Sequence, residues 1–114
     1  MEKLGEWKNI PLTIPTKYVA TEYHNLFFGR QLGPIIMIRC WGAMFKANPA
    51  GQQFILDVPT STIQNDAWLH EGGAGVVNTQ GNLYITGGSI LYAWIAKLNV
   101  RLYGVLIYMT KDWM

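Results

Sequence analysis

Aromatic and polar side chains occur together in the segment from Gln64 to Gly73, whose sequence is Gln-Asn-Asp-Ala-Trp-Leu-His-Glu-Gly-Gly. Trp68 offers a flat ring on which the apolar face of a sugar can stack, and the acidic, amide and imidazole groups around it can bind sugar hydroxyls. The segment lacks an arginine fork, which Arg101 would supply, or else Arg39 or Arg30. The sequence therefore predicts a saccharide site with these candidate residues: Trp68, Asp66, His70, Glu71 and Arg101.

Some of these aromatic residues have a second interpretation. An exposed tryptophan beside a leucine is also typical of a loop that is anchored on the core, so Trp68 and His70 are alternatively packing residues. Trp41 and Trp94 lie in apolar runs that resemble strands, and there packing in the core or in an interface is favoured.

Other kinds of chemistry find little support. A zinc site needs clustered His, Cys or carboxylate ligands, whereas His24 and His70 lie far apart with no second such ligand nearby. Phosphate-binding glycine loops and the Gly-x-Ser-x-Gly motif of hydrolases are absent. Asp66 and Glu71 are the only closely spaced pair among the acids considered for glycoside hydrolysis, and their spacing in a loop fixes no distance. We predict no catalytic residues, no metal and no cofactor.

The composition describes one globular domain. The 114 residues are 50% apolar and 13% aromatic but only 14% charged, and the formal net charge is +2. Basic residues are scattered singly, which argues against nucleic acid as a partner, and the apolar runs are too short for a membrane anchor. We expect a single domain over 1–114, in which 1–15 is an entering segment or the end of a longer fibre. The excess of large apolar side chains predicts burial against another chain or a ligand.

Short apolar segments separated by Gly, Pro and Asn predict an all-β fold. The runs are rich in Ile, Val, Tyr, Phe, Trp and Thr, and their spacing is typical of an antiparallel β-sandwich, jelly-roll-like in its arrangement. No helix is expected, and residues 64–73 are interpreted as a loop. A hairpin over 76–85 is expected to turn at Gly81. The strands are predicted at 35–46, 53–58, 83–86, 90–96 and 100–110.

Two of these strands, 35–46 and 100–110, carry apolar residues on both faces. Such a strand is either central between two layers or covered on its outer face by a neighbouring subunit. Gly42 interrupts the first of them and predicts a bulge or a close backbone approach. Cys40 lies in the same apolar run and is expected to be a buried, unreactive thiol.

Three segments together resemble the C-terminal head, or receptor-binding, domain of receptor-binding and tail-fibre proteins of siphophages that infect Gram-positive bacteria. The first is the strand over 35–42. The second is Val-Pro-Thr at 58–60, followed by a long loop and the hairpin at 75–85. The third is the closing strand over 102–110. The resemblance covers residues 33–110 and is a pattern of strands and turns, without a catalytic signature.

This resemblance implies a β-sandwich or jelly roll that assembles as a homotrimer at the tip of a tail fibre or baseplate of the virion. It also implies host cell-wall saccharide as the ligand, bound by a tryptophan with Asp, His, Glu and Arg, which in this chain points again to the segment around Trp68. Repetition of a weak site in a trimer would raise its avidity. Our leading hypothesis is therefore a non-enzymatic adhesion module. The alternative is a structural assembly or decoration protein of a virion that binds no ligand.

Overall fold

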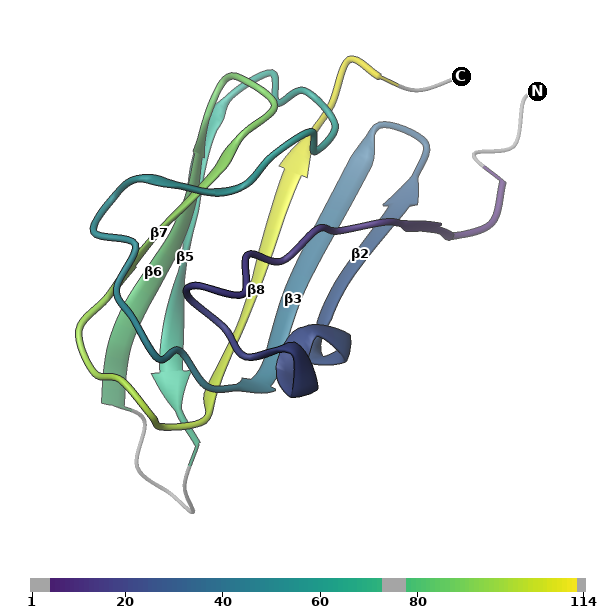
Figure 1. The fold of residues 1–114 in the computed structure, drawn as a ribbon. Coiled ribbons are helices and arrows are strands. Elements are labelled where there is room, and N and C mark those ends of the chain that lie inside the picture. The colour runs from purple at the N-terminus through teal and green to yellow at the C-terminus, as the bar shows by residue number, and fades with distance from the viewer. Residues whose placement is uncertain (1–4, 73–77, 113–114) are drawn as a thin grey trace.

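The computed structural model describes residues 5–72 and 78–112, and these form an all-β fold (Figure 1). All the named strands belong to a single antiparallel sheet, which curls into a half-barrel with the order β1-β2-β3-β8-β5-β6-β7-β4. One short 3-10 helix, η1, precedes β2. The elements are β1 (Lys8–Ile10), η1 (Thr21–Leu26), β2 (Phe27–Leu32), β3 (Ile35–Ala43), β4 (Gln53–Ile55), β5 (Gln64–Glu71), β6 (Asn78–Thr86), β7 (Leu91–Ile95) and β8 (Leu102–Met109).

The five strands predicted from apolar runs are confirmed as β3, β4, β6, β7 and β8, with shifted ends. The entering segment does contain an edge strand, β1, which pairs with β2. Gly42 lies at a bulge in β3, where the register with β8 shifts between Trp41 and Ala43 and the glycine has a φ of +91°. This backbone conformation is one that residues with a Cβ rarely adopt.

The prediction of a turn at Gly81 is wrong. Gly81 lies inside β6, where it pairs with Leu69 of β5 and Ile95 of β7. Its role is close approach, because a Cβ there would come within 2.9 Å of Ile95 Cδ1. The part of the expected hairpin before residue 78 falls on residues 73–77, outside the described residues. The expectation that no helix occurs is also wrong, since η1 forms at Thr21–Leu26.

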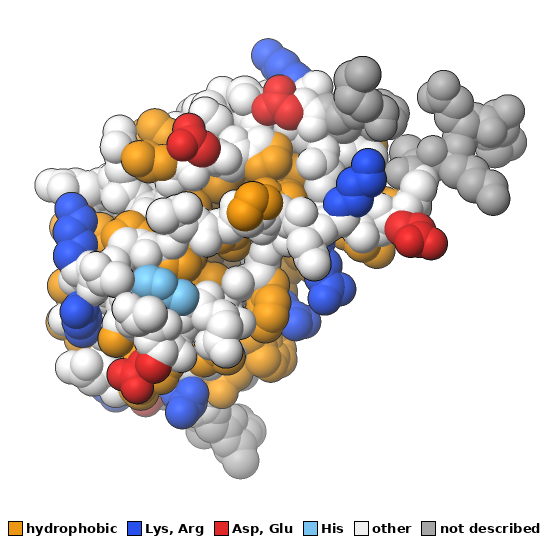
Figure 2. All heavy atoms as spheres, turned by 45° about the vertical axis from the view of Figure 1, so that its right-hand side comes forward, with side chains coloured by type: hydrophobic (Ala, Val, Ile, Leu, Met, Phe, Trp, Pro, Cys, Tyr) orange, Lys and Arg blue, Asp and Glu red, His pale blue; other side chains and the backbone are white. Residues whose placement is uncertain are grey.

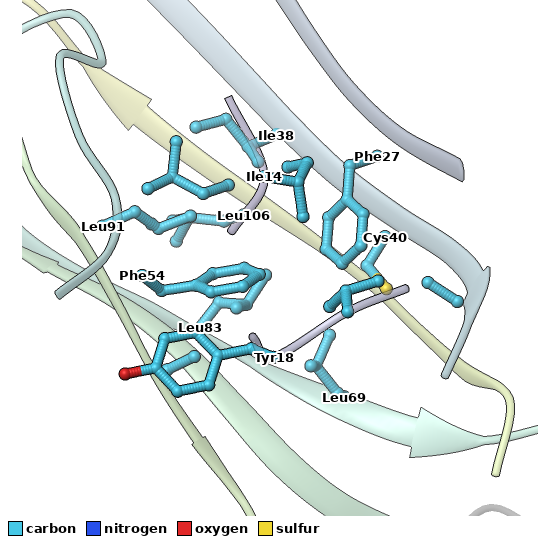
Figure 3. Packing of buried hydrophobic residues seen from close by; sticks show 14 of the residues in the cluster. Ile14, Tyr18, Phe27, Ile38, Cys40, Phe54, Leu69, Leu83, Leu91 and Leu106 are labelled. Atoms are coloured by element: carbon cyan, nitrogen blue, oxygen red, sulfur yellow. The ribbon is translucent and has the colours of Figure 1, made fainter. Parts of the chain in front are cut away.

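The core lies on the inner face of the curled sheet. Figure 1 shows the purple N-terminal segment and η1 crossing this face, and irregular chain after β3 and β4 covers more of it. Phe27, Phe45 and Phe54 pack edge-on or tilted, with ring centroids between 5.2 and 6.1 Å apart. Figure 3 shows Phe54 near Tyr18, at the centre of the buried side chains. In the described residues the second layer is thus irregular chain and not a second sheet.

The outer face of the sheet is apolar over β3 and β8, as the sequence predicts. Leu106 and Tyr108 of β8 are buried, while the alternating residues Val105, Ile107 and Met109 are exposed. On β3 the exposed Trp41 stands over Tyr103 of β8 in an edge-to-face contact, with ring centroids 5.1 Å apart. We call Trp41, Val105, Ile107 and Met109 the apolar outer patch.

Cys40 lies on the inner face of β3 and is fully buried, as expected. Its Sγ donates a hydrogen bond to the Leu102 carbonyl at 3.4 Å. Burial raises the pKa of the thiol to about 12, with a smaller opposing contribution from the Ala43 backbone. Since the thiolate is the nucleophile, this cysteine is unreactive in the folded chain.

Candidate functional site

The segment predicted to be a loop is strand β5 over nearly all its length. Gln64 to Glu71 pair with β6, and the last two of these residues also pair with β8. Sequence reasoning missed this strand because its inward positions are weakly apolar: Asn65, Ala67 and Leu69 face the core, and only Leu69 is fully buried. The outward positions, with Asp66 and Trp68 among them, carry the polar and aromatic groups.

A glycine in the neighbouring strand brings β5 close to β8. A Cβ at Gly104 would lie 2.7 Å from the carbonyl oxygen of Trp68 and 2.6 Å from Leu69 Cδ2. Further along, the side-chain amide of Asn65 donates a hydrogen bond to the Ile107 carbonyl. These contacts fix the distance and the alignment of β5 relative to β8. They thereby fix the position of Trp68 on the outer face.

Pairing of β5, β6 and β7 aligns three side chains in one row. Trp68 lies opposite Asn82, and Asn82 lies opposite Trp94. The two tryptophans are 57% and 49% exposed, and both project from the outer face because Leu69, Leu83 and Ala93 beside the row point into the core. We call Trp68, Asn82 and Trp94 the aromatic row.

The side chains of Asp66 and Asn82 are hydrogen-bonded to each other on this face. Asn82 Nδ2 donates to Asp66 Oδ2 at 3.1 Å and to the carbonyl of Ala67 at 3.3 Å. Because both contacts use the amide nitrogen, the Asn82 Oδ1 and the second oxygen of Asp66 have no hydrogen-bond partner among the described residues. The polar groups beside the aromatic row therefore present acceptors to the solvent.

A second pair of rings stands next to the aromatic row. Tyr84 and Tyr92 are stacked, with centroids 5.3 Å apart and ring planes 14° apart, and Tyr84 lies opposite Asp66. The Tyr84 hydroxyl donates to the Gly51 carbonyl at 3.3 Å, which ties the stack to the chain before β4. A shallow depression of about 310 Å³ begins here. Its lining residues are Gln64, Asn65, Asp66, Tyr84, Ile85 and Thr86.

The structure brings only part of the predicted set together. Asp66 and Trp68 lie side by side on the outer face of β5, and His70 follows on the same strand, opposite Tyr103. Glu71 instead forms an ion pair with Lys97 at 3.3 Å, and the Arg101 guanidinium donates to the Gly42 carbonyl at 2.9 Å. Both of these charges are therefore engaged at the far end of β5.

His70 has a half-buried ring whose Nδ1 has no hydrogen-bond partner in the described part of the chain. Of the alternative arginines, Arg39 stacks between Phe28 and Trp41 at about 5 Å from each ring, on the opposite half of the sheet. Arg30 lies on β2, in that same half.

Sequence reasoning missed Asn82, Tyr84 and Tyr92 as site residues and placed Trp94 in the core or an interface. The alternation in β6 did place Asn82 and Tyr84 on the face opposite Leu83 and Ile85, and this was the available signal. Which strand neighbours β6 on each side, and in what register, was not encoded in that alternation.

In the described parts of the chain, charged and metal-binding groups do not gather at another site. Figure 2 shows basic and acidic side chains dispersed over the visible face. Within residues 5–72 and 78–112 no three His, Cys, Asp or Glu residues are grouped so that they could hold a metal ion. In the same residues no helix has the length and apolar character needed to cross a membrane.

Comparison of the chain with protein-family models, with curated proteins and with solved structures finds no match.

Proposed function

We propose that the chain is a non-enzymatic saccharide-binding module and that the aromatic row with Asp66 is its binding site. The observation that carries this proposal is the alignment of two exposed tryptophans on either side of Asn82, with the Asp66 carboxylate hydrogen-bonded to its amide. The rings supply surface for the C–H face of a sugar, and the acceptor oxygens receive its hydroxyl protons.

Two features favour binding over catalysis. Asp66 and Glu71 are separated by five positions along β5, about 17 Å at the usual rise of a strand. The carboxyl groups of glycosidases are about 5 to 9.5 Å apart, so this pair does not have the required spacing. Glu71 is in addition neutralised by Lys97.

As the biological setting we propose the receptor-binding head of a phage tail fibre or baseplate, which recognises a cell-wall saccharide of the bacterial host. The support is the resemblance of the strands over 35–42 and 102–110 to those of such heads. The second segment of the resemblance gives no support, because strand β5 replaces most of the long loop and Gly81 lies inside β6. The apolar outer patch supports contact with another protein chain, because patches of this kind are typical of protein interfaces, and the resemblance implies that the contact forms a homotrimer.

The apolar outer patch also favours a second candidate, a structural virion protein without a ligand. Trp41 and Ile107 are about half exposed in the single chain, and burial against another protein would remove this surface from water. The two candidates differ in what they expect of the aromatic row, which remains open to solvent only in the first.

Titration calorimetry with bacterial cell-wall polysaccharide tests the saccharide proposal. We expect binding by the native chain, and a loss of tenfold or more in affinity, about 1.4 kcal/mol, for Trp68→Ala with Asp66→Ala. Trp7→Ala is the matched control, since Trp7 is similarly exposed but precedes β1 at the opposite edge of the sheet. Unchanged affinity of the double variant would remove this row from the site.

Sedimentation equilibrium tests the trimer. Ile107→Lys places a charge in the apolar outer patch and is expected to give a folded monomer. Leu56→Lys, at an equally exposed position away from the sheet's outer face, should leave the trimer intact. A native chain that stays monomeric at micromolar concentration would refute the trimer.

A further inference from the structure

The spacing of the two tryptophans restricts the shape of the glycan. Trp68 and Trp94 lie on strands separated by β6, so their backbones are two strand spacings apart, about 10 Å. In an extended, β-linked chain of pyranoses, every second sugar presents the same face, and the repeat of two rings has about this length. Such a chain, laid across the strands, would place one sugar on each tryptophan and the intervening sugar over Asn82.

The charges around the row restrict the chemistry of the glycan. The only carboxylic acids in the described parts of β5, β6 and β7 are Asp66 and Glu71, and these parts contain no Lys or Arg. Lys97, just after β7, is paired with Glu71. The open groups at the centre of the row are acceptors, so they complement hydroxyl or ammonium donors and repel a carboxylate or phosphate.

Resting on the proposed function, we infer that the ligand is an extended, β-linked polysaccharide of uncharged or amino sugars, bound perpendicular to β5, β6 and β7 over at least three consecutive sugars. An α-(1→4)-linked glucan curves, and it cannot keep two sugars flat on both rings. A uronate chain of the same extended shape would bring its carboxylates towards Asp66.

Oligosaccharides of defined length and linkage test this inference by calorimetry. We expect cellohexaose to bind at least tenfold more tightly than cellobiose, because a disaccharide reaches only one of the two rings. Maltohexaose, with α-linkages, and a hexamer of mannuronate, with a carboxylate on every sugar, are expected to bind at least tenfold more weakly than cellohexaose.

Variants separate the two ends of the row. Trp68→Ala and Trp94→Ala should each reduce the affinity for cellohexaose to about that of cellobiose for the native chain, and Trp7→Ala should have no effect. Retention of the native circular dichroism spectrum by each variant shows that the fold is intact. If only one tryptophan affects affinity, the two-ring arrangement is wrong.

The outcomes distinguish this inference from the function on which it depends. Equal affinity for maltohexaose and cellohexaose, or for cellobiose and cellohexaose, would overturn the inference while leaving a saccharide-binding module. Tighter binding of the mannuronate hexamer would likewise overturn it, through its charge requirement. Failure of both these oligosaccharides and cell-wall polysaccharide to bind would refute the proposed function itself.

Discussion

Replacement of Gly104 by alanine tests the close approach of β8 to β5, which positions the aromatic row on the outer face. The new Cβ would lie 2.7 Å from the Trp68 carbonyl oxygen, a backbone atom that cannot rotate away, and 2.6 Å from the fully buried Leu69. Overpacking of this kind costs about 1 to 3 kcal/mol, and a clash with backbone belongs at the upper end. The smaller entropy of the unfolded chain returns about 0.4 to 1 kcal/mol.

The net expectation is a loss of about 2 kcal/mol in the free energy of unfolding, combining these two contributions. For a domain of this size, that lowers Tm by about 10 °C. The assay is thermal and urea unfolding followed by circular dichroism, with Gly88→Ala as the matched control, because a Cβ at Gly88 meets nothing within 4 Å. If Gly104→Ala and Gly88→Ala are equally stable, β5 and β8 do not approach each other as closely as these distances require.

Three other predictions concern titrating or hydrogen-bonded groups. Iodoacetamide should modify Cys40 only on unfolding. Burial raises the pKa of this thiol from 9.0 to about 12. The stabilisation that comes from the protonated thiol is therefore complete below pH 9 and is lost as pH rises towards 12. Rapid labelling of the native chain would contradict this. The backbone amide of Thr60 donates a hydrogen bond to Asp112 at 2.6 Å and lowers the pKa of that carboxyl below 3.8. Asp112→Asn should therefore lower Tm at pH 7, and the difference in Tm between the variant and the native chain should shrink as pH falls below 4. A difference that does not change with pH would exclude the carboxylate charge as its cause. Tyr108→Phe removes a hydrogen bond of 2.7 Å to the Pro59 carbonyl and should lower the free energy of unfolding by about 1 to 2 kcal/mol in urea titrations, whereas no loss would mean that water replaces the hydroxyl.

The sequence predicted the strands whose inward positions are large and branched. In β3 and β8 the buried residues include Ile36, Ile38 and Leu106, and their apolar runs are unmistakable. Strand β2 has Gly29 in its middle, where a Cβ would come 3.1 Å from the Ile10 carbonyl oxygen. Glycine lowers the apparent strand propensity of that segment, yet it is required for β1 to lie close to β2.

The candidate site could be predicted only in part, because it depends on register between strands. Asp66 and Trp68 are near neighbours in sequence, and their residue types alone suggested a sugar site. Asn82 and Trp94 join them only because β6 and β7 pair in one particular register. Arg101 and Glu71 are suitable by residue type, but each has a local partner that the sequence does not indicate.

The outer face of the sheet divides into two surfaces with different requirements. The apolar outer patch exposes Val105, Ile107 and Met109, and its charged neighbour is Arg39, which lies opposite Val105 and stacks on Trp41. A protein that covers this patch therefore needs an acceptor for the guanidinium group of Arg39. The aromatic row cannot be covered in that way, because Asp66 and Asn82 present acceptors that would lose their water. Burying an unpaired carboxylate costs several kcal/mol, whereas a sugar brings hydroxyl donors together with its apolar face. The cost of desolvation at Asp66 therefore agrees with the proposal that the aromatic row binds a sugar and that any protein contact lies over the apolar outer patch.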